Sequence, residues 1–159
     1  MKKACLYIFI LIMCGCNVEK SSEVMLKELL EADISFSEMS IDKGMNHAFI
    51  SFCAHDAVLL RNNAMPLKGA ESISESLSLN DDKAYSLSWE PLHARVAKSG
   101  DLGYTYGTFS MKVKETGAIS KGTYVSIWIM EEGSWKWVLD SGNEGLGSED
   151  LGSEDLGSE

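Results

Sequence analysis

The spacing of apolar residues changes near residue 80, and this change limits the folds open to the chain. Between residues 22 and 79, apart from a short apolar run at residues 57–60, apolar side chains recur every three or four positions, as they do along one face of a helix. From residue 85 to residue 140 they alternate with polar residues, which is typical of half-buried strands. A chain with helices first and strands afterwards is predicted to be an α+β domain, in which N-terminal helices pack on one face of a curved antiparallel sheet.

The boundaries of the predicted elements follow from capping and turn residues. The predicted helices are residues 22–40 with Ser22 as the N-cap, residues 42–56 with Asp42 or Ser40 as the cap, and a weaker helix around Ile73 and Leu77. A short strand is predicted from Ala57 to Arg61, and longer strands at residues 85–97, 102–114, 122–130 and 135–140. The segments SGD, ETGAISKG and EEGS between the long strands suit antiparallel hairpins.

The first 15 residues have the pattern of a secretory signal peptide. Two lysines precede an apolar run over residues 4–13, which is shorter than the ~20 residues of a membrane-spanning helix. The run leads into MCGC, which resembles a bacterial lipobox, and the small Gly15 before Cys16 makes Cys16 the expected lipidated residue. This predicts attachment to the bacterial cell envelope, at the outer membrane facing the periplasm in a host with two membranes. An ordinary cleaved signal is the alternative.

The remaining chain divides into a short tether, one domain and a tail. Residues 16–21 form the predicted tether, and residues 22–143 are predicted to be a single domain. Residues 144–159 repeat the pentapeptide LGSED with little apolar surface to offset chain entropy, so we expect a disordered acidic tail. Only Cys53 lies in the domain, which excludes an internal disulfide there. The formal net charge is −10 without a basic cluster, which argues against nucleic acid as a partner.

The order of these elements resembles the nuclear transport factor 2-like (NTF2-like) superfamily, and more closely its DUF4440 branch. Four stretches that together span about residues 26–143 carry the resemblance: LLEADISFSEMS, FCAHDAVLLRNNAMPLKGAESI, WEPLHARVAKSGDLGYTYGTF and GTYVSIWIMEEGSWKWVLDSGN. The resemblance implies a cone-shaped domain, of the kind found in ketosteroid isomerases and SnoaL-like polyketide cyclases. In that fold a pocket lies between the concave face of the sheet and the helices.

The resemblance does not extend to the catalytic groups of the ketosteroid isomerases. The position of their aspartate base falls near Leu60 or Arg61, neither of which is a carboxylate. Their first helix also carries a tyrosine, whereas residues 26–39 contain none. Steroid-isomerase chemistry is therefore not expected.

Three polar side chains are candidates for the chemistry of the pocket. Asp33 lies within an apolar helical stripe, where burial would raise its pKa and make it a usable base, although it is also suited to a structural role. Asp140 is either a second pocket acid or the cap of the next turn, and a period of two places it opposite Trp135 and Trp137. Arg61 could bind an anionic ligand group. We expect it instead to pair with one of the two carboxylates.

Aromatic residues complete the predicted pocket, and three functions follow from it. The expected lining is Phe49, Arg61, Trp89, Tyr106, Trp128 and Asp140, and the alternative for the aromatic residues is a simple core or a dimer face. No metal or cofactor is expected, because the histidines lack metal-ligand spacing and no phosphate-binding loop occurs. The first function is non-catalytic binding of a small apolar or weakly anionic molecule. The others are an isomerase, dehydratase or cyclase that uses Asp33 or Asp140, and a module with a filled pocket that forms a homodimer through the outer face of the sheet.

Overall fold

The structure is a computed structural model that describes residues 21–79 and 81–146. The predicted signal peptide, Cys16 and nearly all of the predicted tether and tail lie outside the described residues. Within the described part, none of the helices combines the length and the apolar composition needed to cross a membrane.

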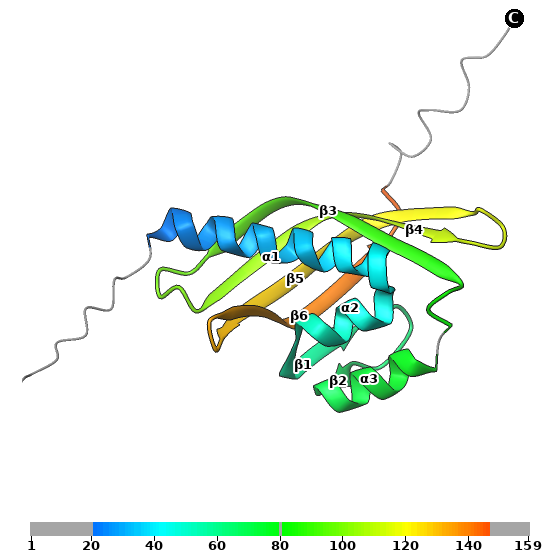
Figure 1. The fold of residues 1–159 in the computed structure, drawn as a ribbon, viewed down its shortest axis with the longest axis horizontal. Coiled ribbons are helices and arrows are strands. Elements are labelled where there is room, and N and C mark those ends of the chain that lie inside the picture. Colours follow the sequence, from blue (N-terminus) through cyan, green and yellow to red (C-terminus); the bar gives the residue numbers. More distant parts are fainter. Residues whose placement is uncertain (1–20, 80, 147–159) are drawn as a thin grey trace, which may run out of the picture.

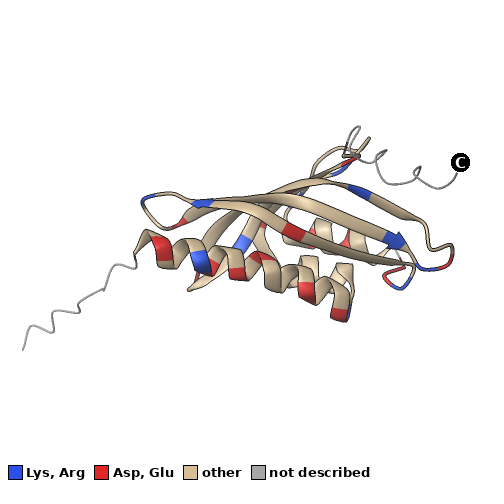
Figure 2. Ribbon diagram, turned by 90° about the horizontal axis from the view of Figure 1, so that it is seen from above, with Lys and Arg blue, Asp and Glu red and all other residues tan. Residues whose placement is uncertain are grey.

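The described residues form three helices and a six-stranded sheet (Figure 1). The helices are α1 (Ser22–Lys43), α2 (Met45–Phe52) and α3 (Ala70–Ser78), and the strands are β1 (Cys53–Leu60), β2 (Leu67–Lys68), β3 (Tyr85–Val96), β4 (Leu102–Val113), β5 (Ile119–Glu131) and β6 (Ser134–Glu144). The strands arch over α1, along which acidic residues are spread (Figure 2). The predicted α+β class, with helices packed on a curved sheet, is confirmed.

The sheet is mixed, although only antiparallel pairing was predicted. Its strand order is β2-β1-β6-β5-β4-β3, and β3 to β6 form the predicted antiparallel meander. β1 runs parallel to β6, and the two-residue β2 pairs with the other edge of β1. A pairing between an early strand and the last one leaves no local pattern in the sequence, and β2 is too short to show a period.

The second predicted helix is shorter than expected because the chain turns into a strand at Cys53. β1 therefore begins four residues before the predicted start at Ala57, and Cys53 is a half-buried strand residue. The N-cap of α2 is Gly44, which has a φ of 96° and no side chain to cap the helix. Asp82 supplies an acceptor there instead, since its Oδ1 accepts a hydrogen bond of 3.0 Å from the backbone N–H of Asn46. The predicted caps Asp42 and Ser40 are wrong for this helix.

The α1 N-terminus differs from the prediction by one residue. Ser21, and not Ser22, is the N-cap, and its Oγ accepts a hydrogen bond of 3.3 Å from the backbone N–H of Val24. Both serines suit the position, so only the backbone conformation at Ser21 distinguishes them.

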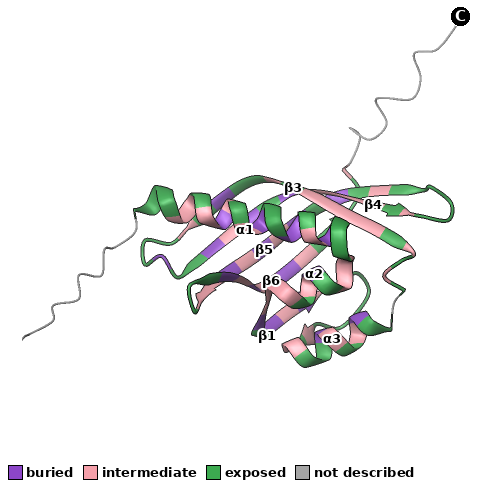
Figure 3. Cartoon of the chain, viewed as in Figure 1, coloured by how far each residue is buried: buried purple, intermediate pink, exposed green. Residues whose placement is uncertain are grey.

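The core lies between the helices and the concave face of the sheet, where the buried residues concentrate (Figure 3). Phe36 of α1 is at its centre and is 1% exposed. Its ring makes edge-to-face contacts with Phe49 on α2, Trp89 on β3 and Trp128 on β5. Aromatic side chains of α2, β3 and β5 thus meet on one residue of α1, and these contacts hold α1 against the sheet.

A bulge in β6 changes which side chains face the core. The register with β5 shifts by one residue between Trp137 and Leu139, which leaves Val138 as an extra residue. Asp140 therefore lies on the same concave face as Trp135 and Trp137, and all three are buried. The prediction that Asp140 faces the side opposite these tryptophans is wrong, because it assumed an unbroken period of two.

Candidate functional site

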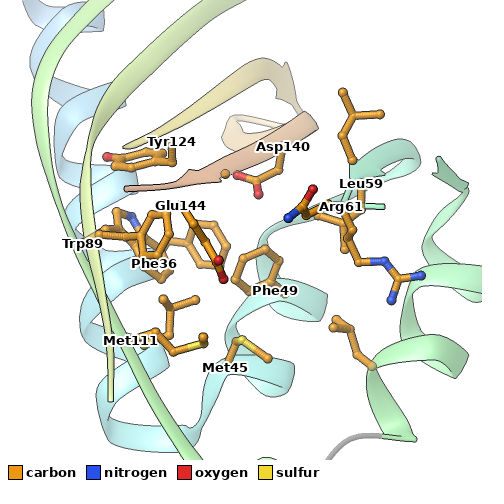
Figure 4. A pocket seen from close by; sticks show the side chains of 16 residues that line it. Phe36, Met45, Phe49, Leu59, Arg61, Trp89, Met111, Tyr124, Asp140 and Glu144 are labelled. Atoms are coloured by element: carbon orange, nitrogen blue, oxygen red, sulfur yellow. The ribbon is translucent and has the colours of Figure 1, made fainter. Parts of the chain in front are cut away.

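A cavity of about 290 Å³ opens between the helices and the concave face of the sheet (Figure 4). Its walls are mainly apolar side chains from α1, α2, α3 and three strands, β1, β3 and β4: Phe36, Met45, Phe49, Leu59, Leu60, Leu77, Leu87, Trp89, Phe109 and Met111. Its polar lining consists of Arg61, Asn62, Tyr124, Asp140 and Glu144. Apolar walls with a few polar groups are typical of small-molecule sites.

Four of the six residues expected in the pocket line this cavity, namely Phe49, Arg61, Trp89 and Asp140. Trp128 is not part of the lining, because it is fully buried in the core and its Nε1 donates a hydrogen bond of 2.9 Å to Thr105 Oγ1. Tyr106 is not part of it either. Its neighbours Thr105 and Gly107 on β4 are buried on the concave side, so Tyr106 faces outward and is 45% exposed.

Asp33 is fully buried behind the cavity and does not line it. Its Oδ1 accepts a hydrogen bond of 2.8 Å from Trp89 Nε1, and its Oδ2 accepts one of 2.7 Å from the Tyr124 hydroxyl. Burial raises the pKa of Asp33, while the hydrogen bonds from Tyr124, Trp89 and Thr105 act in the opposite direction. Both acceptor oxygens are thus occupied by side chains that do line the cavity. Asp33 orients the Trp89 indole and the Tyr124 phenol of the pocket wall.

Tyr124 is a lining residue that the sequence analysis did not identify. Burial and the neighbouring Asp33 raise the pKa of its hydroxyl, so Tyr124 remains a protonated phenol that donates to Asp33. Gly107 on the adjacent strand makes room for the ring, since a Cβ atom at Gly107 would clash with it and with the Glu90 carbonyl. The sequence feature that could have identified Tyr124 is its position four residues before Trp128 in one strand, which places both side chains on the same face of the sheet.

Asp140 contributes a carboxyl group to the inner wall of the cavity. Its Oδ2 accepts a hydrogen bond of 2.6 Å from Ser126 Oγ on the neighbouring strand. Burial raises the pKa of Asp140 to about 7, with a further contribution from the charge of Asp33 and a partial offset from the Ser126 hydrogen bond. Near neutral pH the Asp140 carboxyl is therefore protonated in part of the molecules, where it can donate a hydrogen bond, and is an anion that only accepts in the rest.

Arg61 does not pair with either carboxylate. It follows the last residue of β1, its side chain is exposed, and its Nη1 donates a hydrogen bond of 3.1 Å to Ser76 Oγ on α3. The guanidinium group points away from Asp140 in Figure 4. The predicted pairing of Arg61 is wrong, because a position at the mouth keeps the guanidinium group in water instead of next to a buried acid.

The site can bind a small apolar body and form a few polar contacts with it. Asp140 and Asn62 offer hydrogen-bonding groups, whereas the Tyr124 hydroxyl proton is already donated to Asp33. In the part of the chain that the structure describes, His, Cys, Asp and Glu side chains form no group of three suited to a metal ion.

Comparison with known proteins gives matches only at the level of structure. No family model matches the chain, and no curated protein matches it. A ketosteroid isomerase-like protein from Erwinia carotovora is 17% identical with a TM-score of 0.58, over 75% of this chain and 95% of that one. An NTF2-like protein with a cystatin-like fold from Novosphingobium aromaticivorans is 15% identical with a TM-score of 0.59, over 77% of this chain and 82% of that one.

A third solved structure, from Streptomyces avermitilis, is named as a dehydratase of the NTF2-like family. It is 12% identical with a TM-score of 0.62, over 79% of this chain and 99% of that one. At such identities the likeness extends to the fold, and fold does not imply function. The helices on a curved six-stranded sheet, together with these neighbours, show that the chain has the NTF2-like fold.

Proposed function

We propose that the protein is a lipid-anchored protein of the bacterial cell envelope whose pocket binds a small, mainly apolar molecule without catalysis. The observation that carries the proposal is the cavity of about 290 Å³, whose walls are largely apolar and aromatic. Burial of a ligand's apolar surface against such walls contributes roughly 25 cal/mol per Å². Within the NTF2-like fold, the four stretches that resemble the DUF4440 branch support a place in that branch.

The arrangement of the two buried acids favours binding over catalysis. Asp33 is occupied by Trp89 and Tyr124, so a bound molecule reaches only one of the two candidate catalytic carboxyls, Asp140. Asp33 is then not available as a second acid or base beside Asp140. In our proposal Asp140 binds a hydroxyl or carbonyl group of the ligand.

An isomerase, dehydratase or cyclase that uses Asp140 is the second candidate function. It is favoured by the pKa of about 7 at Asp140, because a catalytic base is most effective when its pKa lies near the working pH. The open cavity argues against an interaction module with a filled pocket. The outer face of the sheet remains our proposal for a homodimer contact, since Leu102 and Tyr106 are exposed there at 45% each.

Filling the cavity tests the binding proposal. Leu87→Trp adds an indole to the β3 wall and is expected to weaken binding of the uncharged apolar fluorophore N-phenyl-1-naphthylamine by at least about tenfold, which corresponds to 1.4 kcal/mol. The matched control is Leu92→Trp on the same strand, at a position that is 64% exposed and outside the cavity lining. Fluorescence titration of both variants, with thermal unfolding as a check of the fold, gives the result. Equal binding by Leu87→Trp and the wild-type protein would show that the dye does not bind in the cavity.

Removal of the proposed lipid attachment site tests the envelope anchor. Cys16→Ser is expected to abolish incorporation of a palmitate analogue in bacterial cells and to leave the precursor uncleaved. Cys14→Ser is the matched control and should be labelled like the wild-type chain, because the bulky Met13 precedes Cys14 and the small Gly15 precedes Cys16. Labelling that persists in Cys16→Ser would contradict the anchor.

A further inference from the structure

A second hollow, of about 390 Å³, adjoins the mouth of the apolar cavity. It lies between the loop that follows β1 and the last residues of β6. Leu60, Arg61, Asn62, Gly142 and Glu144 line both spaces, so the two are adjacent along one side. Asn63, Ser141 and Asn143 line only the second hollow. We refer to this second space as the polar hollow.

The chemistry of the polar hollow differs from that of the apolar cavity. Asn62 and Asn63, in the loop after β1, carry amide groups, and each of these side chains both donates and accepts hydrogen bonds. Ser141 and Asn143 border the hollow from β6, where the alternation of the strand directs their side chains to the face opposite Asp140 and Glu144. Neither Asn62 nor Asn63 hydrogen-bonds through its side chain to another described residue, so their donors and acceptors are available to a ligand. Arg61 and Glu144 carry opposite charges, so the lining of the hollow has no net charge.

These side chains disfavour a ligand group that carries a net charge. A phosphate or sulfate in the polar hollow would meet the Glu144 carboxylate, and an ammonium group would meet the Arg61 guanidinium. A neutral group with several hydroxyls can use the amides and both charged side chains at once, because each hydroxyl donates one hydrogen bond and accepts others. Hydrogen bonds to charged partners contribute more than those between neutral groups.

We propose that the pocket binds an amphiphile, with its apolar part in the cavity and an uncharged polyhydroxyl head group, such as a sugar, in the polar hollow. The proposal rests on the binding function proposed above and adds the chemical class of the ligand. The shared lining places the junction of head and body between Asn62 and Gly142, where β6 continues past the end of β1.

Three probes with one alkyl chain and different heads test this proposal: n-octyl β-D-glucopyranoside, 1-octanol and sodium octyl sulfate. Each is titrated calorimetrically into the whole chain below the concentration at which micelles form. We expect the glucoside to bind about tenfold more tightly than either other probe, as one or two added hydrogen bonds would produce. Asn62→Ala should lower the affinity for the glucoside severalfold and lower that for octanol less. Ser134→Ala, in the exposed hairpin at the opposite end of β6, is the control and should change neither.

The outcomes separate this proposal from the one on which it rests. If octanol binds as tightly as the glucoside, or if Asn62→Ala leaves the glucoside affinity unchanged, the head-group assignment is wrong while apolar binding stands. Tighter binding of octyl sulfate would show that the head group is anionic and would also overturn the assignment. Failure of all three probes to bind would overturn both proposals.

Discussion

Asp33→Ala is expected to lower the free energy of unfolding by about 3 kcal/mol, since each buried donor left without a partner costs about 1–3 kcal/mol. The change removes the acceptor of two hydrogen bonds, from Trp89 Nε1 and from the Tyr124 hydroxyl, at a fully buried position. A domain of this size has a total stability of about 5–15 kcal/mol, so the loss is a large fraction of it. Urea unfolding followed by tryptophan fluorescence measures the change.

Asp33→Asn is the matched comparison for this prediction. Its amide oxygen accepts one of the two hydrogen bonds in nearly the same volume, so we expect a loss of only about 1 kcal/mol. A Tyr124→Phe variant should recover part of the loss in an Asp33→Ala background, because it removes one of the unpartnered donors. If Asp33→Ala were as stable as the wild-type chain, the carboxyl would not hold the pocket wall together.

Asp140→Asn is expected to stabilise the protein at pH 8 and to have little effect at pH 4. The pKa of Asp140 is about 7 in the folded protein, above its ordinary value of 3.8. Between these values the folded protein keeps a proton that the unfolded chain has lost, so the free energy of unfolding falls as the pH rises from about 4 to 7. One pKa unit corresponds to 1.36 kcal/mol, which gives a gain of roughly 2–4 kcal/mol for the neutral amide above pH 7.

Urea unfolding of both proteins at several pH values between 4 and 8 measures this difference. Asp56→Asn, at an exposed position on β1, is the control for the loss of a negative charge and should shift the curve far less. An Asp140→Asn variant that is less stable than the wild-type chain at pH 8 would mean that a cationic partner stabilises the carboxylate. That was the expectation from the sequence, with Arg61 as the partner.

The sequence indicated the fold class because the class depends on local patterns. Helical spacing before residue 80 and strand spacing after it determine which elements form, and their order leaves few ways to bury both apolar faces. The presence of Phe49 and Trp89 in the pocket wall could be predicted for the same reason, since each lies on the apolar face of its own element. The sequence also placed Asp33 on the buried side of α1.

Only the tertiary structure decided how the polar groups are partnered. The bulge at Val138 brings Asp140 to the concave face. Tyr124, which is distant from Asp33 in the sequence, donates a hydrogen bond to its carboxyl group. Arg61 could not be placed from the sequence, because its direction depends on the loop after β1 and on Ser76 of α3. Periodicity defines the faces of a single element, whereas a pocket forms where faces distant in the sequence meet. One extra residue in a strand reverses the direction of every side chain beyond it.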